Sequence, residues 1–122
     1  MSFACAGSRF LMYRDNSFTM FKGDAKNIGD IHFDGFTNFT TNVTSFDKDD
    51  QLYLFTDGFQ DQFGGPNDKK FSFRRMLDLF EGCIDEGLVE QKRIIEEEYD
   101  SWIGDGHQTD DLSVICVKRN VL

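Results

Sequence analysis

Two groups of aspartates lie at the ends of apolar runs, where carboxylates could bind a cation or transfer protons. Asp57 follows the run Leu52–Phe55 after one threonine, and the pair Asp110-Asp111 immediately precedes the run Leu112–Val117. If the two runs are neighbouring antiparallel strands, Asp57 and Asp110 meet at one edge of a sheet. Clustered carboxylate oxygens suit Mg²⁺ or Mn²⁺, which then bind phosphate oxygens. On spacing alone, ordinary turn aspartates are favoured, because Asp-Gly is a common turn pair.

Other polar residues carry weaker signals. The cluster Asp47–Asp50 starts like a calcium loop, but its sixth position is Leu52 instead of glycine and its twelfth is Gly58 instead of glutamate. We therefore reject an EF-hand. His107 lies close to the second acidic site and could be a ligand or proton donor. His32 is expected in a loop, and a lone loop histidine is more often solvated.

Composition bounds the fold and the partners. The chain has 122 residues, 39% of them hydrophobic, including 14 Phe, so one small domain with one core is expected. Its formal net charge of −9 makes it a poor partner for nucleic acid. No leader or membrane-span pattern is present, so no membrane contact is expected. Three scattered cysteines give no disulfide framework and indicate a reducing, cytoplasmic compartment.

The acids must be positioned by strands and helices, and hydrophobic periodicity predicts both. Two amphipathic helices are expected over 72–85, with Ser72 as N-cap, and over 88–102. Their apolar faces carry Phe73, Met76, Leu77, Phe80 and Ile84 in the first, and Leu88, Ile95, Tyr99 and Trp102 in the second. Strands are expected over 2–6, 10–14, 17–22, 36–46, 52–55 and 112–117, with a hairpin turn at Asp15-Asn16. This order predicts an α+β fold with a mostly antiparallel β-sheet and two helices.

Two motifs carry a family resemblance. The segments "DQLYLFTDGFQDQFGG" and "WIGDGHQTDDLSVICVKR", with "KKF" and a helical stretch between them, resemble the C-terminal part of SpoIIE/RsbU-like protein phosphatases, in the metal-dependent PPM (type 2C) superfamily. "FACAGSRFLMYR" and "KNIG" resemble the upstream strand pair and later glycine segment of that family. The resemblance spans nearly the whole chain and implies part of a PPM-type α/β/β/α sandwich.

The resemblance also implies roles for single residues. Asp57 and Asp110 match metal ligands for two Mn²⁺ or Mg²⁺ ions, Asp111 matches a residue that orients ligands, and Gly58 would serve the turn. In the family, a hydroxide held by the ions attacks phosphoserine or phosphothreonine. The implied substrates are phosphorylated regulatory proteins of the anti-sigma-factor antagonist type.

This sequence departs from the family pattern in two places. Ser8 stands where histidine is common, and the first metal motif, an acidic residue before a Ser-Gly-His-Gly-type turn, is absent. We therefore expect residues 1–122 to be the C-terminal portion of a phosphatase domain that binds metal weakly and turns over poorly alone. Exposed apolar faces would then favour self-association, for example as a homodimer. The alternatives are a non-catalytic phosphatase-like interaction or dimerisation module in bacterial signalling, and an unrelated α+β domain with incidental aspartates.

Overall fold

The computed structural model describes residues 1–29 and 38–120, which divide into two compact units. We call residues 1–54, together with the segment from Ile115 onward, the sheet unit, and Phe55–Val114 the helical unit. His32 lies outside the described residues.

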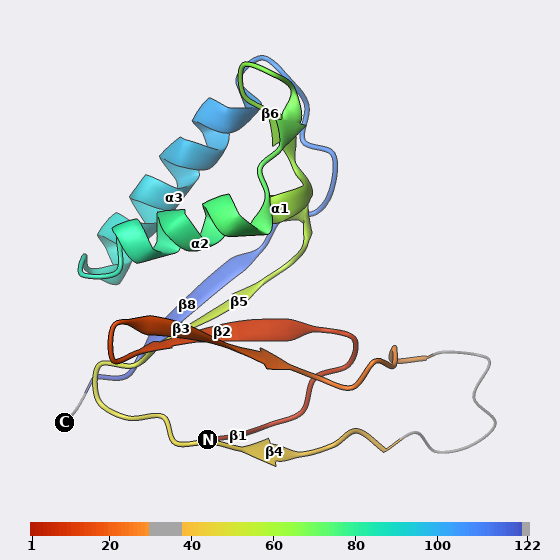
Figure 1. The fold of residues 1–122 in the computed structure, drawn as a ribbon, viewed down its shortest axis with the longest axis vertical. Helices are drawn as coiled ribbons and strands as arrows, with labels where there is room; N and C mark the ends of the chain where they lie inside the picture. Colours follow the sequence, from red (N-terminus) through yellow and green to blue (C-terminus); the bar gives the residue numbers. More distant parts are fainter. Residues whose placement is uncertain (30–37, 121–122) are drawn as a thin grey trace. The chain divides into compact units, whose positions relative to one another are not determined.

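The chain is a mixed α+β protein with antiparallel sheets, as the sequence predicted (Figure 1). The strands assigned mainly to the sheet unit are β1 (Ser2–Phe3), β2 (Arg9–Arg14), β3 (Ser17–Lys22), β4 (Asn42–Val43), β5 (Gln51–Phe55) and β8 (Val114–Lys118). The helical unit holds α1 (Gly58–Asp61), β6 (Phe63–Gly64), β7 (Lys69–Lys70), α2 (Phe73–Gly82) and α3 (Leu88–Ile103). None of the described helices is long and apolar enough to cross a bilayer.

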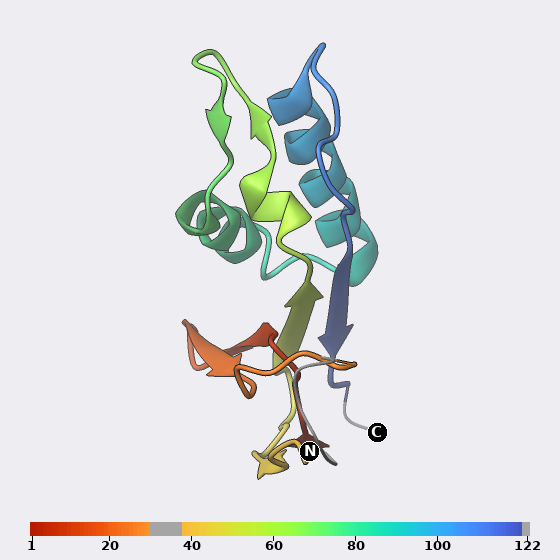
Figure 2. The same ribbon diagram turned by 90° about the vertical axis from the view of Figure 1, so that its right-hand side faces the viewer.

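The main sheet has the strand order β3-β2-β5-β8. The β2–β3 turn is made by Asp15 and Asn16, whose φ values of 49° and 60° match the expected two-residue hairpin. β5 lies between β2 and β8, which confirms its predicted central position (Figure 2). Arg119 N donates to Asp50 O at 3.0 Å, and Thr56 N donates to Ser113 O at 3.0 Å. Residue numbers therefore fall along β8 as they rise along β5, so the two strands are antiparallel.

One face of the main sheet is only partly covered. Phe10, Met12 and Leu52 form its core, against which four partly buried residues pack: Phe3, Cys5, Phe21 and Phe46. Cys116 Sγ lies 3.9 Å from Gln51 Oε1 on the opposite face. Because strand side chains alternate, the covered face continues into three apolar residues that stay 42–57% exposed: Leu54, Ile115 and Val117.

The helical unit packs around aromatic rings. Phe59, Phe71 and Phe80 are fully buried, and the Phe59 ring centroid lies 5.2 Å from that of Phe71 and 5.1 Å from that of Tyr99. Ser72 caps α2 as predicted, since its Oγ accepts a hydrogen bond from Arg75 N at 3.3 Å.

Several local predictions were wrong, among them the strand predicted over 2–6, which ends at Phe3. The strand predicted over 36–46 is reduced, among its described residues, to Asn42–Val43, because only this segment finds a partner strand in β1. The first amphipathic helix ends at Gly82 instead of Asp85. Leu88, assigned to a core face, is 39% exposed at the first turn of α3. The segment after Asp57 was predicted as a turn, but it forms the single helical turn α1 and buries Phe59.

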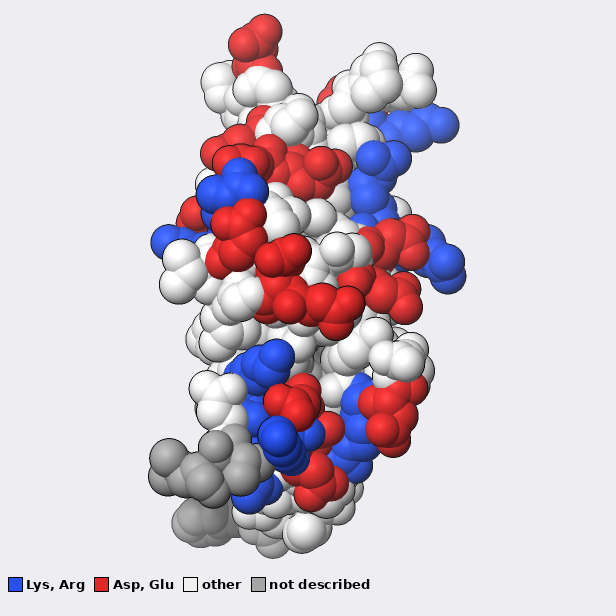
Figure 3. Space-filling model, turned by 90° about the vertical axis from the view of Figure 1, so that its left-hand side faces the viewer, with Lys and Arg blue, Asp and Glu red and all other residues white. Residues whose placement is uncertain are grey.

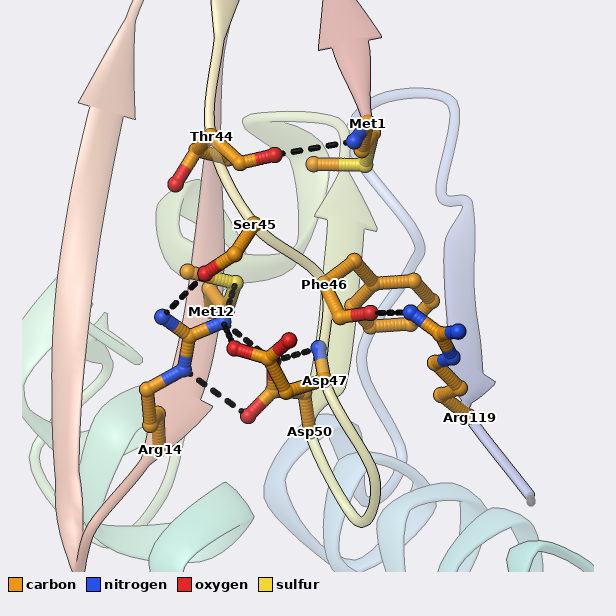
Figure 4. Close-up of polar contacts among 9 residues, drawn as sticks. All are labelled: Met1, Met12, Arg14, Thr44, Ser45, Phe46, Asp47, Asp50 and Arg119. Atoms are coloured by element: carbon orange, nitrogen blue, oxygen red, sulfur yellow. Dashed lines mark hydrogen bonds and ion pairs between the residues drawn. The ribbon is translucent and has the colours of Figure 1, made fainter.

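The acidic cluster at Asp47–Asp50 has a structural role that its sequence did not reveal (Figure 4). Asp50 is only 3% exposed and accepts hydrogen bonds from Arg14 Nε at 3.0 Å and from Arg14 Nη2. It also accepts from Asp47 N at 2.5 Å, and Arg14 Nη1 donates to Ser45 Oγ at 2.8 Å. The hydrogen bond from Arg14 is the largest cause that lowers the pKa of Asp50 below its usual range.

We predict that Asp50→Asn lowers the free energy of unfolding by about 2 kcal/mol at pH 7, because hydrogen bonds to a charged group are lost. Since the pKa of Asp50 is lower in the folded state, its contribution is full above the ordinary aspartate pKa of about 4 and is lost as pH falls through the folded value. Urea unfolding at pH 7 and below pH 4 measures both effects. Asp47→Asn is the control. The Asp47 side chain is 64% exposed, so its ion pair with Arg14 is expected to contribute under about 1 kcal/mol to the free energy of unfolding. Equal losses in the two variants would contradict this account.

Candidate metal centre

Thr56 joins the two acidic motifs within the helical unit. Its Oγ1 donates to the carbonyl oxygen of Asp111 at 2.9 Å and accepts from Ser113 N at 2.9 Å. Its own backbone N–H donates to Ser113 O at 3.0 Å. One threonine therefore fixes the segment that carries Asp57 against the segment that carries Asp110 and Asp111. Sequence analysis treated Thr56 as part of a motif and gave it no role.

Gly58 allows the closest approach between these segments. A Cβ atom built on Gly58 would overlap the carbonyl oxygen of Asp111 and lie 3.0 Å from its carbonyl carbon. Gly58 is buried and begins α1, and its φ is not in the left-handed region. A left-handed backbone is therefore not the reason for glycine at this helical turn. Glycine is required because a neighbouring backbone occupies the space of a side chain.

The three predicted site acids lie on exposed backbone around this contact. Asp57 is the residue before α1, and its carboxylate makes no capping hydrogen bond to that helix. Asp110 Oδ1 accepts from Asp111 N at 2.7 Å, which ties its side chain to the local backbone. The structure thus brings together the segments carrying Asp57, Asp110 and Asp111, as the antiparallel arrangement required.

Gln62 is a buried residue that anchors the loop before Asp110, and sequence analysis missed it. Its Nε2 donates to His107 O at 2.8 Å, and its Oε1 accepts from Thr109 N at 3.1 Å. Tyr99 Oη also donates to this Oε1 at 3.1 Å. At 1% exposure, Gln62 has no solvent to replace these partners, so it fixes the backbone that precedes Asp110. A single glutamine in a polar run gives no sequence signal of such burial.

The two other polar candidates occupy ordinary positions. His107 is exposed, and its contact with Gln62 uses its backbone carbonyl oxygen instead of its imidazole. Ser8, which stands in place of the family histidine, is exposed in the sheet unit, and its carbonyl oxygen accepts from Gly23 N at 2.9 Å.

The donor set was tested for its fit to a divalent cation. Asp57 and Asp110 supply hard, exposed oxygen ligands, which suit Mg²⁺ or Mn²⁺. Within residues 1–29 and 38–120 no group of three or more His, Cys, Asp or Glu side chains is placed to hold an ion. Mg²⁺ is commonly bound by one or two carboxylates together with waters and substrate phosphate. The described acids therefore form no closed ion site, and their number and type are those that an open Mg²⁺ site uses.

Comparison with known proteins gives the family of this α+β chain. The family model described as "Stage II sporulation protein E (SpoIIE)" matches residues 1–120. The chain belongs to the SpoIIE family. A search of curated proteins returned no match.

Two solved structures are similar to this chain. The SiaA-PP2C domain of Pseudomonas aeruginosa is 25% identical with a TM-score of 0.84, and the match covers 98% of this chain and 46% of that one. The phosphatase domain of the cell fate determinant SpoIIE from Bacillus subtilis shares the fold at 15% identity and a TM-score of 0.62, over 95% of this chain and 50% of that one. This chain therefore spans about half the length of the two solved domains.

We predict that Gly58→Ala lowers the free energy of unfolding by about 1–3 kcal/mol, because the added methyl group overlaps the Asp111 backbone. The measurement is urea unfolding, with amide hydrogen exchange at Ser113 reporting whether the contact opens. Gly82→Ala is the matched control, since a Cβ there meets nothing within 4 Å and the position is helical, so stability should rise by up to about 1 kcal/mol. A Gly58→Ala chain as stable as the wild type would contradict the close approach.

Proposed function

We propose that this chain supplies part of the active site of a metal-dependent serine/threonine protein phosphatase, with Asp57 and Asp110 as ligands for Mn²⁺ or Mg²⁺. The observation that carries the proposal is the Thr56 bridge, which holds the Thr-Asp-Gly segment against the Thr-Asp-Asp segment. Family membership and the similarity to a PP2C domain support the same reaction class.

Each residue has a distinct proposed part. Asp57 and Asp110 would provide anionic oxygens to the cation, while Asp111 would orient the site through its backbone, which Thr56 and Gly58 contact. Gln62 would hold the loop before Asp110 in place. A bound Mn²⁺ or Mg²⁺ activates water and offsets charge on phosphoryl oxygens. The proposed substrate is a phosphorylated regulatory protein of the anti-sigma-factor antagonist type.

The chain alone is expected to be a weak enzyme. Two carboxylates leave most of an octahedral coordination shell to water and phosphate, so the affinity for the ion should be low. Because the chain spans about half of its solved neighbours, full activity is expected to require residues equivalent to their unmatched part.

We predict that the wild-type chain binds Mn²⁺ weakly and hydrolyses p-nitrophenyl phosphate slowly and only with Mn²⁺, and that Asp57→Asn and Asp110→Asn each abolish both properties. Isothermal titration calorimetry measures the binding, and release of p-nitrophenol measures the reaction. Asp105→Asn, in the same exposed region, is the control for loss of one negative charge and should change neither property. Metal binding that survives in both site variants, or is lost equally in the control, would refute the assignment.

A second candidate function is a non-catalytic interaction or dimerisation module, and one observation favours it. Leu54, Ile115 and Val117 form an exposed apolar patch beside the covered core of the main sheet, and β8 is an edge strand of that sheet in the described structure. Exposed apolar faces and unpaired strand edges favour association with another chain. We propose a homodimer in which this patch is buried.

We predict that Ile115→Lys shifts the chain to a monomer of 14.1 kDa, whereas the wild type has a larger mass by light scattering at high concentration. Ile115 is 57% exposed, so a lysine in its place puts a positive charge in the centre of the proposed contact. Val89→Lys is the control, because Val89 is 87% exposed on α3 and lies outside the patch. A wild-type mass of one chain at every concentration would exclude the homodimer.

A further inference from the structure

A pocket in the helical unit is separate from the paired acids. Its volume is about 420 Å³, within the size range of small-ligand sites. It is bounded by the β6–β7 hairpin, the first turn of α2 and the end of α3, and its lining includes Gly64, Lys69, Lys70, Phe71, Arg75 and Trp102.

The wall of the pocket is built by close packing. A Cβ on Gly64 would overlap the Trp102 carbonyl oxygen, and a Cβ on Gly65 would lie 2.5 Å from the Trp102 ring. Gly65 N also donates to Trp102 O at 2.8 Å. The Phe71 ring meets the Trp102 ring edge-on at 5.4 Å. These contacts hold the β6–β7 hairpin against α3 and restrict movement of the Phe71 and Trp102 rings.

Positive charge is concentrated at this pocket although the chain has 22 acidic and 13 basic residues. Lys69, Lys70 and Arg75 line it, and its described lining includes no acidic residue. Arg75 lies over the Trp102 ring, with its guanidinium carbon 4.3 Å from the ring centroid. Lys70 is paired with Asp61 at 3.0 Å, an exposed pair of small energy. Figure 3 shows several Lys and Arg side chains along the upper right, with acidic side chains directly below them and further acidic surface at the upper left.

The Arg75 guanidinium, which lies over the Trp102 ring, has the chemistry to recognise an anion. Guanidinium planes that rest on an aromatic ring keep their N–H edges available for carboxylate or phosphate oxygens. The pocket also borders the first turn of α2, where Ser72 accepts from Arg75 N and backbone N–H groups add positive potential. The stacked cation, the lysines and the helix end thus act on the same volume.

We propose that this pocket binds an acidic segment of a partner protein. The identity of the partner as a phosphoprotein substrate rests on the proposed function, because such a substrate must be held while its phosphate reaches the acids. The binding of an acidic segment does not depend on that function. An acidic segment is favoured because an extended peptide can bring several carboxylates to the three cations that line the pocket, Lys69, Lys70 and Arg75. The strongly acidic remainder of the chain would repel the same segment elsewhere, which restricts it to this pocket.

Trp102 is the one tryptophan of the sequence, so its fluorescence reports directly on the pocket. The probe is a tryptophan-free peptide of six glutamates, titrated into the chain in EDTA at low salt. We expect saturable change of Trp102 emission, and a Lys69→Glu variant should bind about tenfold more weakly, which equals the loss of about one strong charge contact. Raising the salt concentration should weaken binding, because exposed charges are screened.

The matched control is Lys92→Glu, which makes the same change in net charge on α3, where Lys92 is 74% exposed and pairs with Glu96. It should leave the affinity within about twofold, well below one tenfold step. Equal weakening by both reversals, or no effect of Lys69→Glu, would overturn the proposal. The proposal would also be overturned if Trp102 emission changed on addition of anionic lipid vesicles or adenosine diphosphate but not on addition of the peptide.

Because the titration contains EDTA, it separates this proposal from the proposed function. Asp57→Asn should bind the peptide like the wild type even if it loses Mn²⁺ binding. A chain that binds the peptide but shows no phosphatase activity would support the binding pocket and contradict the proposed enzymatic function. A chain that has phosphatase activity but does not bind the peptide would contradict the proposal that this pocket binds an acidic segment.

Discussion

The contact between two backbone segments at Gly58 and Asp111 is the constraint on which the candidate site depends. Thr56 supplies the hydrogen bonds that draw the segments together, and the missing side chain at Gly58 gives them room. Neither feature supplies a carboxylate, yet both hold the segments that carry the acids against each other. The chemistry of an open carboxylate site therefore begins with steric fit between main chains.

Buried polar side chains organise both units in the same way. Asp50 ties Arg14 to the turn at Asp47 in the sheet unit, and Gln62 ties α3 to the loop before Asp110 in the helical unit. Each is almost fully buried with its partners satisfied, so moving either would leave unpaired polar groups. Polar loops have few apolar side chains to bury, so hydrogen bonds to such buried residues hold them in place. The candidate functional acids lie on loops of this kind.

Elements with strong periodicity were predicted well, and short elements were not. β3 matched its predicted bounds, and Ser72 capped α2, because alternation and capping chemistry are local properties. α1 was not predicted, and the strand containing β4 was predicted too long, because a four-residue helix and a two-residue strand depend on what packs against them. The acids at the strand ends were identified as candidates from position, whereas Thr56 and Gln62 were found only in three dimensions.

The sequence alone determined the fold class, the family resemblance and the three aspartates worth examining, because periodicity and motif order are written along the chain. Only the tertiary structure decided why Gly58 must be glycine, which polar residues are buried, and that Lys69, Lys70 and Arg75 share a pocket with Trp102. The physical reason is that each of these facts depends on residues 27 to 65 positions apart meeting in space. No local pattern specifies such a meeting, since it results from the packing of whole elements.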